Sequence, residues 1–334
     1  MSEIEKVDIV ITWVDGADPE WVAERDMWKS KLTGEPVPQN MAVRYRDWDN
    51  LQYIFRGIEE FMPWVNKVHL VTWGHLPKWL NTDNDKLNIV NHKDFIPEEY
   101  LPTFNSDVID VNLFRIPGLA DRFIYFNDDM FVIKKTDISE FVINGIPCDM
   151  AAVSPQPIQS DSIAHIELNN LQVLNENFTV NDIKRNKSKW LKFGKYGQFA
   201  IRTFIFMHFS TIIGIFEPHV PLVYDKNTIK EVWDKEFDVF DKTSRNKFRE
   251  PDEVSLWLTR QWKLMKGEFL PRTHKFGRYI SASDPDGVKA AINDKACKLV
   301  CINDDSKVTD LDVAKQKINS LLDQLLPNKS SFEK

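Results

Sequence analysis

Short apolar runs alternate with one clear helical pattern in the first part of the chain. Val7–Val14 is rich in β-branched residues and stops at Asp15-Gly16, which predicts a buried strand followed by a turn. Between Leu51 and Phe61 the apolar residues recur at helical spacing, and Pro63 ends the predicted helix. Further strands are predicted at Lys67–Trp73, Leu87–Val90 and Phe123–Phe126. This alternation favours an α/β fold with a mostly parallel sheet flanked by helices.

The rest of the chain divides into two further regions. The residue pattern changes over 154–216 and predicts a mainly helical insertion there. Within it, basic and aromatic side chains alternate along Lys184–Arg202. A strand is predicted at Lys298–Ile302, followed by a helix with an apolar face between Leu311 and Leu325. We therefore expect an α/β region over 1–153, the insertion over 154–216, and over 217–334 the remainder of the α/β fold with a helical tail.

Composition narrows the class of protein. The 334 residues carry a net charge of −7, which argues against a nucleic-acid-binding protein. The three cysteines, Cys148, Cys297 and Cys301, are too few and too irregular for a disulfide framework and fit a reducing cytoplasm. Cys297 and Cys301 also lack the spacing and companion ligands of a zinc site. Neither a signal peptide nor a transmembrane helix is expected.

Polar residues follow two of the predicted strands. Asn127-Asp128-Asp129 comes directly after Phe123–Phe126, and two adjacent carboxylates at a strand end can hold Mg²⁺ or Mn²⁺ against a diphosphate. Thr12, Trp13, Asp15 and Gly16 end the first strand, where the indole ring could stack on a base or a sugar. In both places an ordinary polar turn is the alternative interpretation.

Two residues in the last third of the chain are suited to phosphate chemistry. His219 lies between Pro218 and Pro221, and its imidazole can act as acid, base or nucleophile near neutral pH. Arg249 offers a planar fork that matches phosphate oxygens. The alternatives are a structural histidine and a surface salt bridge. The basic and aromatic Lys184–Arg202 predicts contact with a membrane surface or an anionic acceptor, with a solvated helix as the alternative.

Four blocks of sequence, in this order, resemble the Stealth family of sugar-phosphate transferases. The first is VDIVITWVDGADP at Val7–Pro19, and the second, from Tyr45 to about Val132, contains RDWDNLQYIFRGIEEFMPWVNKVHLVTWG, LPTFNS and RIPGLADRFIYFNDDMF. The third contains PHVP and FDKTSRNKFR between Pro218 and Arg249, and the fourth runs from Asp252 to Trp262. The ending LPNKSSFE is also similar to that of bacterial members. That family includes bacterial capsular and cell-wall polysaccharide phosphotransferases and the animal N-acetylglucosamine-1-phosphotransferase.

The resemblance implies a UDP-sugar donor, a divalent cation, and release of UMP as the sugar leaves with its β-phosphate. It implies that His219 and Arg249 are essential. Asp15, Asp128 and Asp129 match acidic positions of the family, so Asp15 is expected to be a catalytic residue that holds the nucleotide or the cation, and Asp128 and Asp129 are expected to bind the metal. His219 is expected to be the general base, with a phospho-histidine intermediate as the alternative. The expected substrate-binding residues are Thr12, Trp13, Gly16, Arg46, Asp47, Arg56, Asn105, Ser106 and Asp252.

Two departures from the family pattern bear on donor or acceptor specificity. Asp107 stands where many members have histidine, and Trp48-Asp49 stands where many have Gly-Glu. The expected acceptor is an oligosaccharide or a lipid-linked saccharide, placing the protein in the cytoplasm, with peripheral contact at the inner face of a bacterial membrane. The alternative functions are a metal-dependent glycosyltransferase that releases UDP and a non-catalytic carbohydrate-binding module.

Overall fold

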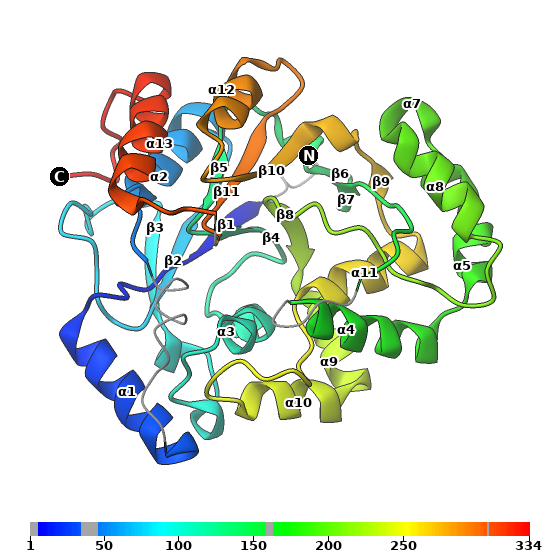
Figure 1. Cartoon of the computed structure of the whole chain (residues 1–334), viewed down its shortest axis with the longest axis horizontal. Helices are drawn as coiled ribbons and strands as arrows, with labels where there is room; N and C mark the ends of the chain where they lie inside the picture. The colour runs from blue at the N-terminus through cyan, green and yellow to red at the C-terminus, as the bar shows by residue number, and fades with distance from the viewer. Residues whose placement is uncertain (1–5, 35–45, 158–162, 306) are drawn as a thin grey trace.

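A five-stranded sheet forms the centre of the computed structural model, which describes residues 6–34, 46–157, 163–305 and 307–334 (Figure 1). Its strand order is β3-β2-β1-β4-β8. β1 (Val7–Thr12) pairs in parallel with β2 (Val68–Thr72) and β4 (Arg122–Asn127), and β3 (Leu87–Asn91) extends the parallel part. Only β8 (Leu222–Asp225) runs antiparallel, against β4. The predicted α/β class with a mostly parallel sheet is confirmed.

The strand order changes direction between β1 and β4, and this junction determines where a ligand can bind. Thr12 and Asn127, the last residues of the two strands, lie opposite each other. Because β8 is antiparallel to β4, its first residue, Leu222, pairs with Tyr125 near the same edge. Parallel sheets bind ligands at such a junction, beyond the carboxyl ends of the strands. The chain segments around Thr12, Asn127 and Leu222 therefore meet where a site is expected.

A second sheet continues directly from the first. After β4 the chain turns at Asp128-Asp129 into β5 (Met130–Val132), which pairs antiparallel with β11 (Leu299–Asn303), and β10 (Gly277–Ser281) completes the sheet. The backbone N–H of Ile302 donates to the carbonyl of Asp129 at 2.8 Å. This pairing brings the C-terminal part of the chain to the end of β4. The third, smallest sheet contains β6 (Val142–Ile143), β7 (Ile146–Asp149) and β9 (Leu270–Pro271).

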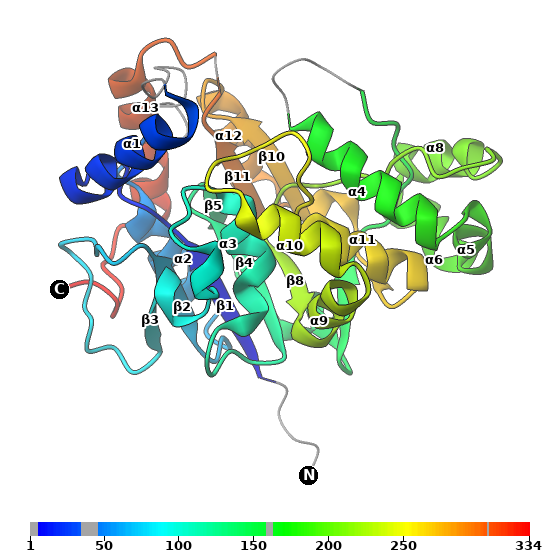
Figure 2. The same cartoon turned by 90° about the horizontal axis from the view of Figure 1, so that it is seen from below.

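Helices surround these sheets (Figures 1 and 2). α2 (Leu51–Phe61) packs so closely on β5 that a Cβ at Gly57 would lie 2.7 Å from the Val132 carbonyl oxygen. The other helices of the first half are α1 (Pro19–Thr33), α3 (Ser106–Asn112) and α4 (Ala164–Asn177). Those of the last third are α9 (Lys226–Lys235), α10 (Phe237–Arg245), α11 (Trp257–Lys266), α12 (Pro285–Asn293) and α13 (Leu311–Leu325).

The basic and aromatic stretch Lys184–Arg202 falls on four short helices. These are α5 (Val180–Arg185), α6 (Lys187–Trp190), α7 (Phe193–Tyr196) and α8 (Gln198–Phe206). Trp190 and Tyr196 are fully buried, so half of the aromatic residues assigned to a surface in fact belong to the core. Within the described residues, no helix is both long and apolar enough to span a bilayer.

Candidate active site

A cavity of about 420 Å³ lies at the carboxyl ends of β1 and β4. Thr12 and Trp13 line it from the end of β1, Asn127–Asp129 from the end of β4, and His219 from the loop before β8. Three further segments also line the cavity, Arg46–Trp48, Asn105–Asp107 and Ile302–Asp304. Arg249 and Trp257 add two more wall residues. Most of the predicted site residues therefore share one cavity, although they are distributed over some 240 positions of the chain.

His219 is held in an unusual conformation at the cavity wall. Its φ is +47°, a left-handed value that costs a non-glycine residue on the order of 1–3 kcal/mol. The ring packs edge-on against Trp257 and Tyr279, at centroid distances of 5.5 and 5.4 Å. Burial lowers the pKa of His219, and the nearby Asp129 offsets part of that effect. The imidazole is therefore neutral at neutral pH and can accept a proton.

A buried arginine anchors the loop that carries His219. Arg260 on α11 pairs with the carboxylate of Glu217, donates to the Phe216 carbonyl at 3.1 Å, and forms a bidentate pair with Asp149 at 2.7 and 3.0 Å. Such a charge-assisted fork restricts the backbone on the N-terminal side of Pro218. The strained His219 conformation thus rests on a rigid support.

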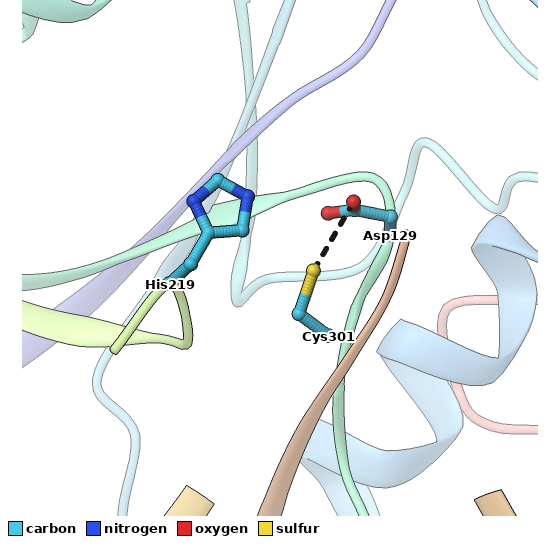
Figure 3. A group of neighbouring side chains, drawn as sticks. All are labelled: Asp129, His219 and Cys301. Atoms are coloured by element: carbon cyan, nitrogen blue, oxygen red, sulfur yellow. Dashed lines mark hydrogen bonds between the residues drawn. The ribbon is translucent and has the colours of Figure 1, made fainter. Parts of the chain in front are cut away.

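Asp129, His219 and Cys301 form a compact cluster of possible metal ligands (Figure 3). One ligand atom from each residue lies within 4.8 Å of the others. The Cys301 thiol donates to Asp129 Oδ2 at 3.2 Å, whereas Asp129 Oδ1 is enclosed without a hydrogen-bond partner among the described residues. Burial raises the pKa of Cys301 well above its usual value, with Asp129 adding to the shift, so the thiol serves as a donor. An unpartnered carboxylate oxygen is suited to a divalent cation.

Several aspartates from different segments line the cavity. The Asp128 side chain is open to water in the cavity, but protein atoms surround it. Desolvation by these protein atoms, together with repulsion from Asp129, raises the pKa of Asp128 to about 7. Burial likewise raises the pKa of Asp47 and of Asp304. A cation beside Asp128 and Asp129 would relieve the repulsion between these two carboxylates. The acidic set therefore fits a divalent cation that prefers oxygen ligands.

Arg249 faces the cavity through a network with the start of α3. Its Nε lies 3.0 Å from Asp107 Oδ2, and its Nη2 donates to Ser106 Oγ at 2.6 Å. Asn105 caps the helix by accepting from the Asp107 N–H at 3.1 Å. Three residues predicted for the site, Asn105, Ser106 and Arg249, are thus brought together. Asp107, which departs from the family pattern, positions the guanidinium.

Replacing Arg249 by lysine should lower kcat by about 10²-fold, because one ammonium cannot replace the planar, two-pronged donor that Asp107 holds at the cavity. The measurement is steady-state kinetics with saturating acceptor. Arg245→Lys is the matched control, since Arg245 is paired with Asp241 on α10 and does not line the cavity. Loss of activity in both variants, or in neither, would contradict a specific role for Arg249.

Thr12 and Trp13 belong to small networks at the end of β1. Thr12 Oγ1 lies 3.0 Å from the Tyr125 hydroxyl, which donates to Asp110 Oδ1 at 2.7 Å. Burial raises the pKa of Asp110 to about 8. Trp13 meets the His75 ring edge-on at a centroid distance of 5.2 Å. These contacts hold the wall residues in fixed orientations.

Four of the residues assigned to the site lie elsewhere. Asp15 and Gly16 lie in the turn outside the cavity wall, where Asp15 Oδ1 accepts from the Ala17 N–H at 2.9 Å. Arg56 faces away from the cavity and clamps the C-terminal tail through a bidentate pair with Glu333, 2.9 Å for both bonds. Asp252 is on the surface, paired with Lys242. The structure therefore places Arg56 and Asp252 outside the cavity wall.

The sequence analysis missed three residues of the site. Asp304 and Trp257 line the cavity, and Cys301 lies in the cluster with Asp129 and His219. Asp304 lies between Arg46, at 3.7 Å, and the indole N–H of Trp48, at 3.2 Å. One signal was available for it, because Asn303-Asp304-Asp305 follows a predicted strand just as Asn127-Asp128-Asp129 does. Cys301 carries no comparable local signal, and Asp107 was marked only as a departure from the family pattern.

Three regions of the chain match models of one protein family. Residues 5–33 match Stealth protein conserved region 1, residues 44–148 match conserved region 2, and residues 290–334 match conserved region 4. The fourth block was therefore misplaced at Asp252–Trp262. The true region contains β11, Asp304 and the tail that Arg56 clamps.

Full-length relatives carry enzyme names. The capsular polysaccharide phosphotransferase WcwK of Streptococcus pneumoniae is 36% identical over 100% of both chains. The exopolysaccharide phosphotransferase cps2G of Lactiplantibacillus plantarum is 33% identical over 98% of this chain and 96% of its own. A crystal structure of the galactosyltransferase LgtC aligns with 97% of this chain and 98% of its own at 10% identity and a TM-score of 0.35, too low to support an argument. The whole-length matches to the two phosphotransferases and the three conserved regions establish that the chain belongs to the Stealth family and is a phosphotransferase.

Proposed function

We propose that this enzyme transfers a hexose 1-phosphate from a UDP-sugar to a carbohydrate hydroxyl, in the synthesis of capsule or cell-wall polysaccharide. The observation that carries the proposal is the position of His219 and Arg249 on the wall of one acidic cavity. A neutral imidazole and a positioned guanidinium fork together suit attack on phosphorus. The acceptor is an oligosaccharide or a lipid-linked saccharide, at the cytoplasmic face of the membrane.

The proposed reaction is an in-line displacement at the β-phosphorus. The acceptor hydroxyl oxygen forms a new bond to that phosphorus, and the bond from it to the bridging oxygen of the α-phosphate breaks, so UMP leaves. His219 takes the hydroxyl proton, and Arg249 stabilises the charge on the phosphoryl oxygens. A direct displacement requires no phospho-histidine, which remains the less favoured route.

The remaining wall residues have binding roles in this proposal. Trp13 and Thr12 contact the base or sugar of the donor, and Arg46 and Asp47 hold its polar groups. Asp128 and Asp129 hold the divalent cation, which neutralises diphosphate charge. Residues 1–153 thus bind the nucleotide-sugar, residues 154–216 face the acceptor or the membrane, and residues 217–334 supply His219 and Arg249.

The nucleotide released tests this function directly. We expect UMP, together with a phosphodiester on the acceptor, when the protein is incubated with UDP-hexoses, Mg²⁺ and an oligosaccharide acceptor. Chromatography identifies the nucleotide and phosphorus NMR identifies the product. Release of UDP with a phosphate-free glycoside would replace the proposal by a glycosyltransferase, which cleaves on the other side of the anomeric oxygen.

A further inference from the structure

α8 exposes an apolar face that its own fold does not cover. Ile201, Phe204 and Ile205, at positions i, i+3 and i+4, are 55%, 52% and 54% exposed. Ala200 and Thr203 on the opposite face are fully buried. A surface helix normally shows the reverse pattern, with polar residues outward. Ala200 and Thr203 already anchor α8 to the rest of the protein. Packing within the protein therefore does not account for the apolar residues on the outer face of α8.

Two exposed phenylalanines flank this outer face of α8 along the chain. Phe193 on α7 is 53% exposed, and Phe209, just after α8, is 49% exposed. Tyr196 and Ala200 pack with Met150 and Ala152 in a separate small core that holds α7 and α8 to the rest of the protein. Both views show α8 at the periphery of the molecule, toward the right-hand edge (Figures 1 and 2). Single exposed apolar residues are common, but a group of this size on one short segment indicates an interaction surface.

The charge around this face selects the kind of partner. Residues 183–216 contain seven lysines and arginines and neither aspartate nor glutamate. The other 300 residues carry 36 basic and 50 acidic side chains, a net charge of −14. Lys184 on α5, Lys187 on α6 and Lys192 between α6 and α7 are exposed, and all three precede the apolar face. A symmetric contact between two copies would bring two such basic segments together and is disfavoured.

We propose that the α8 face, Ile201, Phe204 and Ile205 with Phe193 and Phe209 beside it, docks the enzyme on an anionic lipid bilayer. A bilayer with anionic headgroups offers both an apolar layer for these side chains and negative charge for the lysines. This contact goes beyond the proposed reaction and does not depend on it. It would hold the cavity near acceptors that are anchored in the membrane.

Vesicle flotation of the full chain tests the proposal without donor or acceptor. We expect binding to phosphatidylcholine vesicles that contain phosphatidylglycerol, loss of binding at high salt, and little binding to phosphatidylcholine alone. Phe204→Ser with Ile205→Ser should weaken binding by at least about tenfold. Neutralising Lys184, Lys187 or Lys192 to glutamine should weaken it by about fivefold for each lysine.

A matched control separates the α8 face from general hydrophobicity. Phe237→Ser on α10 removes an aromatic ring of similar exposure, 54%, and should leave vesicle binding unchanged. Circular dichroism and turnover on a water-soluble acceptor should stay at wild-type levels in all variants. The proposal is overturned if the wild-type protein stays in solution with anionic vesicles at low salt, or if Phe237→Ser weakens binding equally. It is also overturned if the protein is a dimer that Phe204→Ser with Ile205→Ser converts to a monomer, since the face would then bind a second copy.

Discussion

His219→Ala should lower turnover by about 10²–10⁴-fold and leave donor affinity nearly unchanged, because a general base acts on the acceptor proton and not on the nucleotide. The imidazole is kept neutral by burial and held by Trp257 and Tyr279, so alanine removes the base without removing a charge that binds phosphate. The loss should appear in kcat. Steady-state kinetics with varied donor and saturating acceptor measure the effect.

His165→Ala is the matched control, since His165 is an exposed histidine on α4 that does not line the cavity. It should retain wild-type turnover. Near-wild-type kcat in His219→Ala would remove the imidazole from the mechanism. Detection of a phosphate on His219 after donor is added without acceptor would instead change its role from base to nucleophile.

Local patterns were enough to predict the central fold. β1, β2 and β4 are short, β-branched or aromatic runs that end at polar residues, and such runs predict buried strands wherever they occur. Since the carboxyl ends of parallel strands share an edge, the approach of Thr12 to Asn127 follows from the fold class alone. The presence of β8 at that edge does not follow from the fold class, because β8 pairs antiparallel with β4, a strand almost a hundred positions away in the sequence.

Long-range pairing also explains the site residues that the sequence did not reveal. Cys301 reaches Asp129 only because β11 pairs with β5, and nothing near Cys301 in the sequence specifies that partner. Asp107 was marked by the sequence but its partner was not, because Asp107 meets Arg249 only where α3 and the segment after α10 converge. Arg56 is the opposite case, a residue assigned to the site that the fold places outside the cavity wall. Arg56 lies in a block of sequence that resembles the family. On α2, however, its guanidinium pairs with Glu333 of the C-terminal tail, which neutralises the positive charge.

The acidic end of β4 leads to the prediction of cation dependence. Treatment with EDTA should abolish activity, and Mg²⁺ or Mn²⁺ should restore it. Asp129→Asn should lower turnover by about 10³-fold, since charge stabilisation by a bound metal supplies several kcal/mol. Asp128→Asn should act in the same direction. Asp83→Asn, a change at an exposed aspartate outside the cavity, is the control and should behave as wild type.

A measurement that does not depend on turnover separates metal binding from other roles of these carboxylates. A ligand that binds only the folded state raises its melting temperature, so Mn²⁺ should stabilise the wild-type protein and fail to stabilise Asp129→Asn. Cys301→Ser should keep most of the Mg²⁺-dependent activity, because the thiol donates to Asp129 Oδ2 and a hydroxyl can do the same. Complete loss of Mg²⁺-dependent activity in Cys301→Ser, with zinc binding by the wild type, would instead make the thiol a ligand of a mixed nitrogen, oxygen and sulfur site. Full activity in the presence of chelator would exclude a metal at Asp128 and Asp129 and leave the charge of the diphosphate to Arg249 and Arg46.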